Sequence, residues 1–153
     1  MRSKMIITFV GHRKMLICEE LRNRIISTIK ANLTVDNNIF YCGGYGAFDT
    51  ACARIVKQLK SETPSIESVF VTPYLNDRHL HDNEIYELYD SILYPPIESV
   101  PYRFAISKRN EYMINNSDVI IAYVSNDLGG AFKTLMYAKR KNKKIINLAD
   151  KYV

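Results

Sequence analysis

The sequence predicts an α/β protein built around a mainly parallel sheet of about five strands. Three observations support this fold class. Short apolar runs recur along the chain, amphipathic helical patterns separate them, and the first run, at 5–10, is apolar enough for a strand buried on both faces. The 153 residues fit one domain spanning 1–153.

The first half of the chain alternates strand and helix patterns. After the strand at 5–10, Leu21, Ile25 and Ile29 recur every four residues and predict an amphipathic helix over 21–33. A turn at 36–38 precedes the second strand at 39–42, which leads into a helix over 48–59. The segment 62–65 ends that helix, and a short third strand follows at 69–71.

The second half continues the pattern after an irregular stretch. Helical spacing of apolar residues predicts a helix over 83–93, and the prolines at 95, 96 and 101 then exclude regular structure. That proline-rich segment, with Glu98 and Arg103, could fold over a site as a lid. Ser107 is a possible cap for a helix reaching 116. A fourth strand at 119–124, a helix over 132–139 and a final strand at 145–148 complete the chain.

The composition narrows the class of protein. No apolar run approaches the ~20 residues of a membrane span, and no signal-peptide pattern is present. The three cysteines have no metal-ligand spacing, so we expect a cytoplasmic protein with reduced thiols and no membrane partner. The net charge of +5 is concentrated at 139–144, which is either the basic end of a helix or a nucleic-acid patch.

Two glycine turns, each between an apolar run and a helical pattern, are the strongest functional signals. The first contains Gly43, Gly44, Tyr45 and Gly46; the second contains Gly129, Gly130 and Ala131. Glycine lets the backbone approach a ligand closely, and a helix that starts there presents free N–H groups and partial positive charge. Because phosphate is the usual occupant of such sites, the turns predict a nucleotide or nucleotide-derived ligand.

Other candidate residues follow the ends of the predicted strands, where open α/β sheets bind their ligands. Arg13 could hold a phosphate, and His12 could donate a hydrogen bond or act as a general acid. Asp49 is either a helix cap or an acceptor for a ribose hydroxyl. The remaining candidates for ligand contact are Gly11, Thr72, Pro73, Arg109 and Asn110, with Arg109 as a possible phosphate clamp.

Several chemistries are disfavoured. The first glycine turn is not a full dinucleotide fingerprint, because Asp49 stands where the third glycine belongs and Thr72-Pro73 stands where an acidic residue is expected. P-loop, nucleophile-elbow and zincin motifs are missing from the sequence. Histidines at 79 and 81, with Asp77 and Asp82, match no strong metal pattern, so we expect neither a metal nor a cofactor.

The motifs and their order resemble the SLOG superfamily, which is named after the Smf/DprA and LOG proteins, and in particular its DUF1273/YpsA-like branch. The matching stretches span nearly the whole chain and lie at 8–13, 42–49, 94–98, 109–113, 117–118, 129–131 and 137–138. The resemblance implies a Rossmann-like three-layer fold that binds nucleotides or their derivatives, often as a dimer.

The same resemblance suggests residues for catalysis. LOG enzymes cleave the N-glycosidic bond of nucleoside 5′-monophosphates with an arginine on the helix before the last glycine turn, and Arg109 matches that arginine. Their glutamate after the turn has no counterpart, since Phe132-Lys133-Thr134 follows here, so Asp49 or Asp127 would have to replace it.

Three functions follow from these observations. The first is sensing or sequestration of a nucleotide-derived small molecule at the carboxyl edge of the sheet. The second is phosphoribohydrolase activity, and the third is single-stranded nucleic-acid binding by analogy with DprA, with the basic cluster at 139–144 as its footprint.

Overall fold

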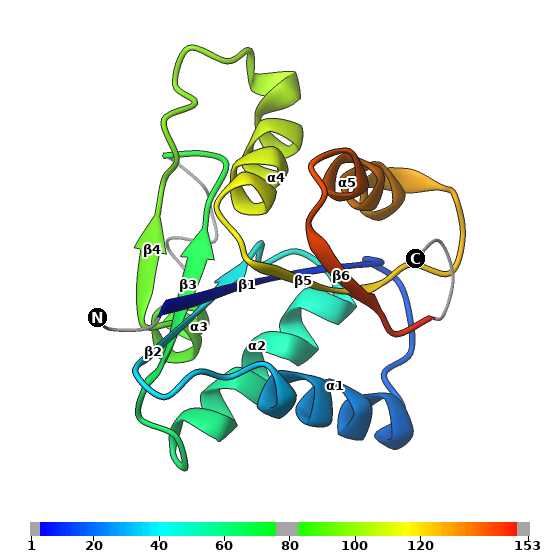
Figure 1. Cartoon of the computed structure of the whole chain (residues 1–153). Helices are drawn as coiled ribbons and strands as arrows, with labels where there is room; N and C mark the ends of the chain where they lie inside the picture. Colours follow the sequence, from blue (N-terminus) through cyan, green and yellow to red (C-terminus); the bar gives the residue numbers. More distant parts are fainter. Residues whose placement is uncertain (1–3, 76–82, 150–153) are drawn as a thin grey trace.

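The computed structural model describes residues 4–75 and 83–149 (Figure 1). Its strands are β1 (Lys4–Gly11), β2 (Asn37–Cys42), β3 (Ile66–Val71), β4 (Ser91–Leu93), β5 (Val119–Tyr123) and β6 (Lys144–Asn147). Its helices are α1 (Glu19–Ala31), α2 (Ala47–Lys60), α3 (Asn83–Leu88), α4 (Ala105–Asn115) and α5 (Gly129–Arg140), and a 3-10 turn, η2 (Tyr102–Phe104), precedes α4. The predicted α/β fold class is confirmed.

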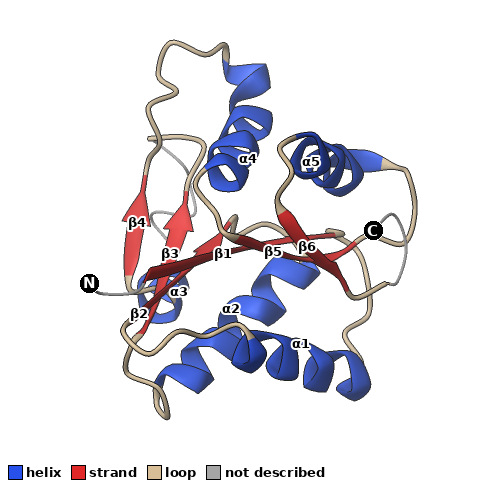
Figure 2. Cartoon of the chain, in the orientation of Figure 1, coloured by secondary structure: helices blue, strands red, loops and turns tan. Residues whose placement is uncertain are grey.

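The strands form one parallel sheet in the order β4-β3-β2-β1-β5-β6. Helices cover both faces: α1 and α2 lie on one side, α4 and α5 on the other (Figure 2). The order of the strands reverses at β1, because β2 pairs with one side of β1 and β5 with the other. In doubly wound sheets, ligands bind beyond the carboxyl ends of the strands at such a reversal.

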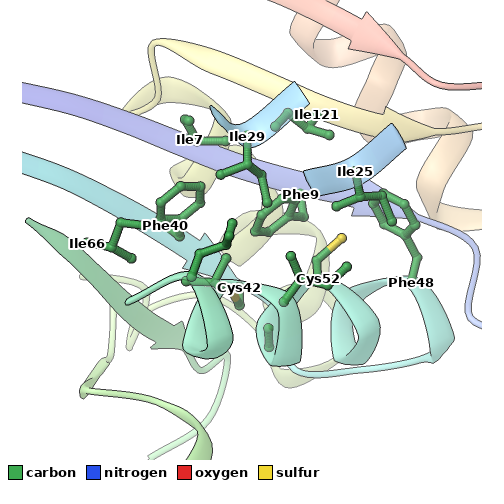
Figure 3. Packing of buried hydrophobic residues seen from close by; sticks show 14 of the residues in the cluster. Ile7, Phe9, Ile25, Ile29, Phe40, Cys42, Phe48, Cys52, Ile66 and Ile121 are labelled. Atoms are coloured by element: carbon green, nitrogen blue, oxygen red, sulfur yellow. The ribbon is translucent and has the colours of Figure 1, made fainter. Parts of the chain in front are cut away.

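The main core lies between the sheet and the helices α1 and α2 (Figure 3). Phe9 of β1 stacks on Phe40 of β2 with ring centroids 5.7 Å apart, and it meets Phe48 of α2 edge to face. The stripe predicted for the first helix supplies Leu21, Ile25 and Ile29 to this core. A second cluster joins β1 and β5 to α5, so both faces of β1 are buried, as the continuous apolar run predicts.

The helix expected over 83–93 differs from the prediction, because it ends at Leu88. Ser91–Leu93 form the strand β4 instead, and the sheet has six strands. The cause is a contact with β3. The Asp90 carboxyl accepts a hydrogen bond from the backbone N–H of Ser68, and the Asp90 backbone N–H donates to the Ser68 carbonyl. These contacts, distant in sequence, draw the chain into the sheet and override the local helical spacing.

The start of α4 also differs from the prediction. The helix begins at Ala105 after the 3-10 turn, and Ser107 lies inside its first turn rather than capping it. Pro101, with φ −55°, begins that turn, and the N-cap residue Phe104 makes no side-chain capping bond. Among the described residues, no helix combines the length and apolar character that a membrane crossing requires.

Candidate functional site

A pocket of about 640 Å³ lies beyond the carboxyl ends of β1 and β5, where the strand order reverses. Its walls come from the loop after β1, the start of α2, the helix α4 and the loop that leads into α5. The predicted site residues that line it are Gly11, His12, Arg13, Tyr45, Asp49, Arg109, Asn110, Gly129, Gly130 and Ala131. One pocket therefore contains residues from both glycine turns.

The second glycine turn presents open backbone to this pocket. The helix α5 begins at Gly129, whose φ of 84° favours glycine. A Cβ atom added at Gly129 or at Gly130 would meet no atom within 4 Å. The first amides of an α-helix have no acceptor within the helix and carry partial positive charge, so this end of the pocket suits an anion.

The glycines of the first turn serve packing instead. A Cβ atom on Gly44, whose φ is 76°, would lie 1.9 Å from the ring of Phe70, and one on Gly46 would lie 2.5 Å from Cα of Arg13. The first amide of α2, that of Ala47, already donates to the Arg13 carbonyl at 2.8 Å. What the first turn offers the pocket is therefore the side chains of Tyr45 and Asp49.

Arg109 is buried although it lies on a helix, with only 3% of its surface exposed. Its Nη1 donates to the carbonyls of Gly43 and Val71, at 3.0 and 2.6 Å, and its guanidinium carbon lies 5.3 Å from the centre of the Tyr45 ring. Arg109 thus fixes the first glycine turn against the end of β3. A phosphate contact made by the same side chain stays a prediction.

A chain of hydrogen bonds connects Arg109 to the second glycine turn. Arg109 Nε donates to Asn110 Oδ1 at 2.9 Å, and Asn110 Nδ2 donates to Thr134 Oγ1 at 3.3 Å. The Thr134 hydroxyl then donates to the Gly130 carbonyl at 2.9 Å. Polar side chains of α4 and α5 therefore hold the two turns at a fixed distance across the pocket.

The loop after β1 supplies His12, Arg13 and Lys14 to the pocket. His12 Nε2 accepts a hydrogen bond from the backbone N–H of Ser125 at 3.0 Å, which places the ring proton of the neutral form on Nδ1 and ties this loop to the end of β5. Arg13 is exposed and lies over the Tyr45 ring, with 5.6 Å between its guanidinium carbon and the ring centre. Arg13 and Lys14 add positive charge to this wall.

Asp49 occupies the first turn of α2 and faces the pocket. Burial raises the pKa of its carboxyl to about 7, although the positive charges of Arg109 and Arg13 and a hydrogen bond from the Tyr45 backbone act in the opposite direction. Within the described part of the chain, its buried Oδ1 atom has no hydrogen-bond partner. The N-cap residue of α2 is Gly46, and the Asp49 carboxyl accepts its backbone hydrogen bond from Tyr45, which precedes the helix.

Some predicted residues lie outside this lining: Gly43, Gly44, Gly46, Thr72, Pro73 and Asp127, as do Glu98 and Arg103 of the proline-rich segment. The Thr72 hydroxyl donates to the carbonyl of Tyr74 and accepts from its N–H, and so stabilises the loop after β3. The described residues contain no cluster of metal-ligating side chains, whereas Asp77, His79, His81 and Asp82 lie outside the described residues.

Sequence reasoning missed further residues of the lining, among them Lys14, Ile106, Asn126, Leu128 and Thr134. Lys14 follows Arg13 directly, and Asn126 and Leu128 belong to the second turn, so their positions were a usable signal. Ile106 and Thr134 enter the site only because α4 and α5 pack side by side, which local sequence does not encode.

No protein-family model matches the chain. The chain is 27% identical over 139 residues to an uncharacterized SPbeta prophage-derived protein, YoqJ, from Bacillus subtilis, and the match covers 79% of this chain and 81% of that protein.

Two solved structures are similar in fold. One is a DNA processing protein A from Helicobacter pylori, described by its single-stranded DNA binding mode, which gives a TM-score of 0.60 at 14% identity. The match covers 92% of the present chain but only 63% of the Helicobacter pylori chain. A molybdenum cofactor carrier protein from Chlamydomonas reinhardtii gives a TM-score of 0.60 at 17% identity, with 96% and 77% covered. These likenesses show that the chain has the Rossmann-like α/β fold.

Proposed function

We propose that this protein binds a nucleotide or a nucleotide-derived small molecule in the pocket between β1 and α5. The observation that carries the proposal is the pocket itself, which lies where the strand order reverses and is lined by the open start of α5, at Gly129 and Gly130. Arg13 and Lys14 add cations to the same walls, as an anionic ligand requires.

The resemblance in sequence motifs supports the same proposal. DprA, one of the proteins with a similar fold, is a SLOG member. We further propose that the chain belongs to the DUF1273/YpsA-like branch of that superfamily and that it forms a homodimer in the cytoplasm. Size-exclusion chromatography with light scattering tests the dimer directly.

Thermal unfolding with added ligands tests the binding proposal. The probes are AMP, ADP-ribose and NAD, with inorganic phosphate as the matched control for the anion alone. A ligand present at 100 times its Kd stabilises the folded state by about 2.7 kcal/mol, which corresponds to a rise in Tm of roughly 5–10 °C. Unchanged unfolding with every nucleotide at millimolar concentration would rule the proposal out.

Hydrolysis of a nucleoside monophosphate is a second candidate, favoured by the position of Asp49 in the pocket beside Arg109. A carboxylate there could direct a water molecule to the sugar carbon that carries the base. Chromatography after incubation with AMP tests this function. Free adenine that appears with the wild type and not with Asp49→Asn supports it, whereas equal traces exclude it.

Nucleic-acid binding is favoured by one separate observation on α5. Arg140 and Lys141 lie over the ring of Tyr137, at 5.9 and 5.5 Å from its centre, so an aromatic side chain lies beside the basic cluster at 139–144. Basic residues beside an aromatic ring suit single-stranded nucleic acid. Affinity for a single-stranded oligonucleotide that is independent of salt concentration would contradict this candidate.

A further inference from the structure

The buried Oδ1 atom of Asp49 is a polar group that the binding proposal leaves unexplained. Asp49 lines the pocket, and no donor among the described residues reaches its Oδ1 atom. The Asp49 carboxyl already accepts a hydrogen bond from the Tyr45 backbone, which precedes the helix α2. A carboxylate offers about four lone-pair positions, so this contact leaves Oδ1 able to accept from a ligand. A buried acceptor without a donor is unfavourable, and a ligand that supplies one is bound more tightly.

The charges in the pocket determine which part of a ligand can reach Asp49. An anionic group is repelled by the ionised carboxylate and is attracted to the amides of Gly129 and Gly130 and to Lys14. The group that faces Asp49 must therefore be an uncharged or positively charged donor. A hydroxyl carried by the same molecule as the phosphate, and separated from it by a few bonds, meets this requirement.

We propose that Asp49 is a specificity-determining residue of the pocket, which accepts a hydrogen bond from a ribose hydroxyl of the bound nucleotide. This inference rests on the proposed binding function and narrows its ligand class to ribonucleotides and other ribose phosphates. A ligand without these hydroxyls leaves Oδ1 unsatisfied and is bound more weakly.

The test compares AMP with 2′,3′-dideoxy-AMP by isothermal titration calorimetry at pH 8, where the Asp49 carboxyl, with its pKa of about 7, is ionised. The proteins are the wild type, Asp49→Ala, Asp49→Asn and the control Glu62→Gln, which removes an exposed negative charge just beyond the far end of α2. A hydrogen bond to a charged acceptor predicts that the wild type prefers AMP by about tenfold to a hundredfold.

The predicted pattern is specific to Asp49. Asp49→Ala binds both nucleotides alike, Asp49→Asn retains the preference of about twofold to tenfold that a neutral hydrogen bond gives, and Glu62→Gln behaves as the wild type does. Should Asp49→Ala fail to fold, the near-isosteric Asn variant carries the test. Equal binding of the two nucleotides by the wild type, or an undiminished preference in the Asp49 variants, overturns this inference and leaves the binding proposal standing. Absence of binding to both nucleotides overturns this inference, and the binding proposal falls with it when ADP-ribose and NAD also leave thermal unfolding unchanged.

Discussion

Two ionisable side chains, Arg109 and Asp49, give the site its character at the scale of the residue. Arg109 is buried and donates to the carbonyls of Gly43 and Val71, so its charge is compensated by backbone dipoles. The negative charge of Asp49 is compensated less completely. Burial raises the pKa of its carboxyl by more than Arg109, Arg13 and the hydrogen bond from the Tyr45 backbone lower it. The structure therefore keeps a carboxyl that titrates near neutral pH in the pocket wall.

The raised pKa of Asp49 makes the stability of the protein depend on pH. The carboxyl ionises near pH 3.8 in the unfolded chain and near pH 7 in the folded one, so between these values the folded state holds the extra proton. The free energy of unfolding therefore falls as pH rises from about 4 to about 7. Asp49→Asn has no carboxyl to ionise, so its free energy of unfolding does not fall over this pH range. We therefore predict that the variant is more stable than the wild type by up to about 4 kcal/mol at pH 8.

Urea denaturation at pH 4, 6 and 8 measures this effect, and the gain of Asp49→Asn should shrink to nothing at the lowest pH. Asp90→Asn is the control of opposite sign: burial acts to raise the pKa of Asp90, but hydrogen bonds from Lys60 and Ser68 outweigh burial and lower it. Asp90→Asn should thus be less stable than the wild type at all three pH values, because the stabilisation by the Asp90 carboxylate is lost only when the pH falls below 3.8 and through its lowered pKa. A gain of Asp49→Asn that is the same at all three pH values would contradict the assignment.

The two glycine turns, alike in sequence, differ in role at the scale of the element. In the turn before α2, Gly44 makes room for the ring of Phe70, whereas Gly130 in the turn before α5 has open space in front of it. The sequence correctly predicted that each turn would join a strand to a helix. It could not show which turn is open, because Phe70 comes from β3, far from Gly44 along the chain.

Alanine substitutions separate these two roles. Gly44→Ala places a side chain at a φ of 76° and against Phe70, so we predict a loss of about 2–4 kcal/mol in unfolding free energy. Gly130→Ala should change stability by less than about 1 kcal/mol, since no atom lies within 4 Å of the new methyl group. We expect it to weaken AMP binding by roughly tenfold, because the methyl group takes space beside the α5 amides.

Urea denaturation and calorimetric titration of AMP measure the two effects. If Gly130→Ala bound AMP as tightly as the wild type, the phosphate would lie elsewhere in the pocket or outside it. Phosphate binding to the wild type alone serves as the control for the anion site.

The sequence predicted helices and strands correctly where the spacing of nearby apolar residues determines them. It failed where a contact with a residue distant in sequence determines the secondary structure. The continuous apolar run of β1 and the stripe of Leu21, Ile25 and Ile29 were sufficient to predict a buried strand and an amphipathic helix. The spacing of apolar residues predicts a helix where β4 is found, because the pairing of β4 with β3 depends on the contacts between Asp90 and Ser68, which are distant in sequence.

At the scale of the whole molecule, the order of strands brings the candidate residues together. Successive strands are added on one side of β1 from β2 to β4 and on the other side from β5 to β6. The carboxyl ends of β1 and β5 lie next to each other, where Gly11 pairs with Tyr123. Alternation of strands and helices predicted that site residues would gather along one edge of the sheet. Which of them share a pocket follows from the packing of α4 against α5, and from the bonds that link Arg109, Asn110 and Thr134.

The most direct test of this account is an amide nuclear magnetic resonance titration of the ¹⁵N-labelled protein with AMP. We predict saturable shifts that are largest for the backbone amides of Gly129, Gly130 and Ala131, at the start of α5, with smaller changes at Arg13 and Tyr45. Amides at the start of α5 that stay unmoved at saturating AMP, whether or not resonances change elsewhere, would contradict the account.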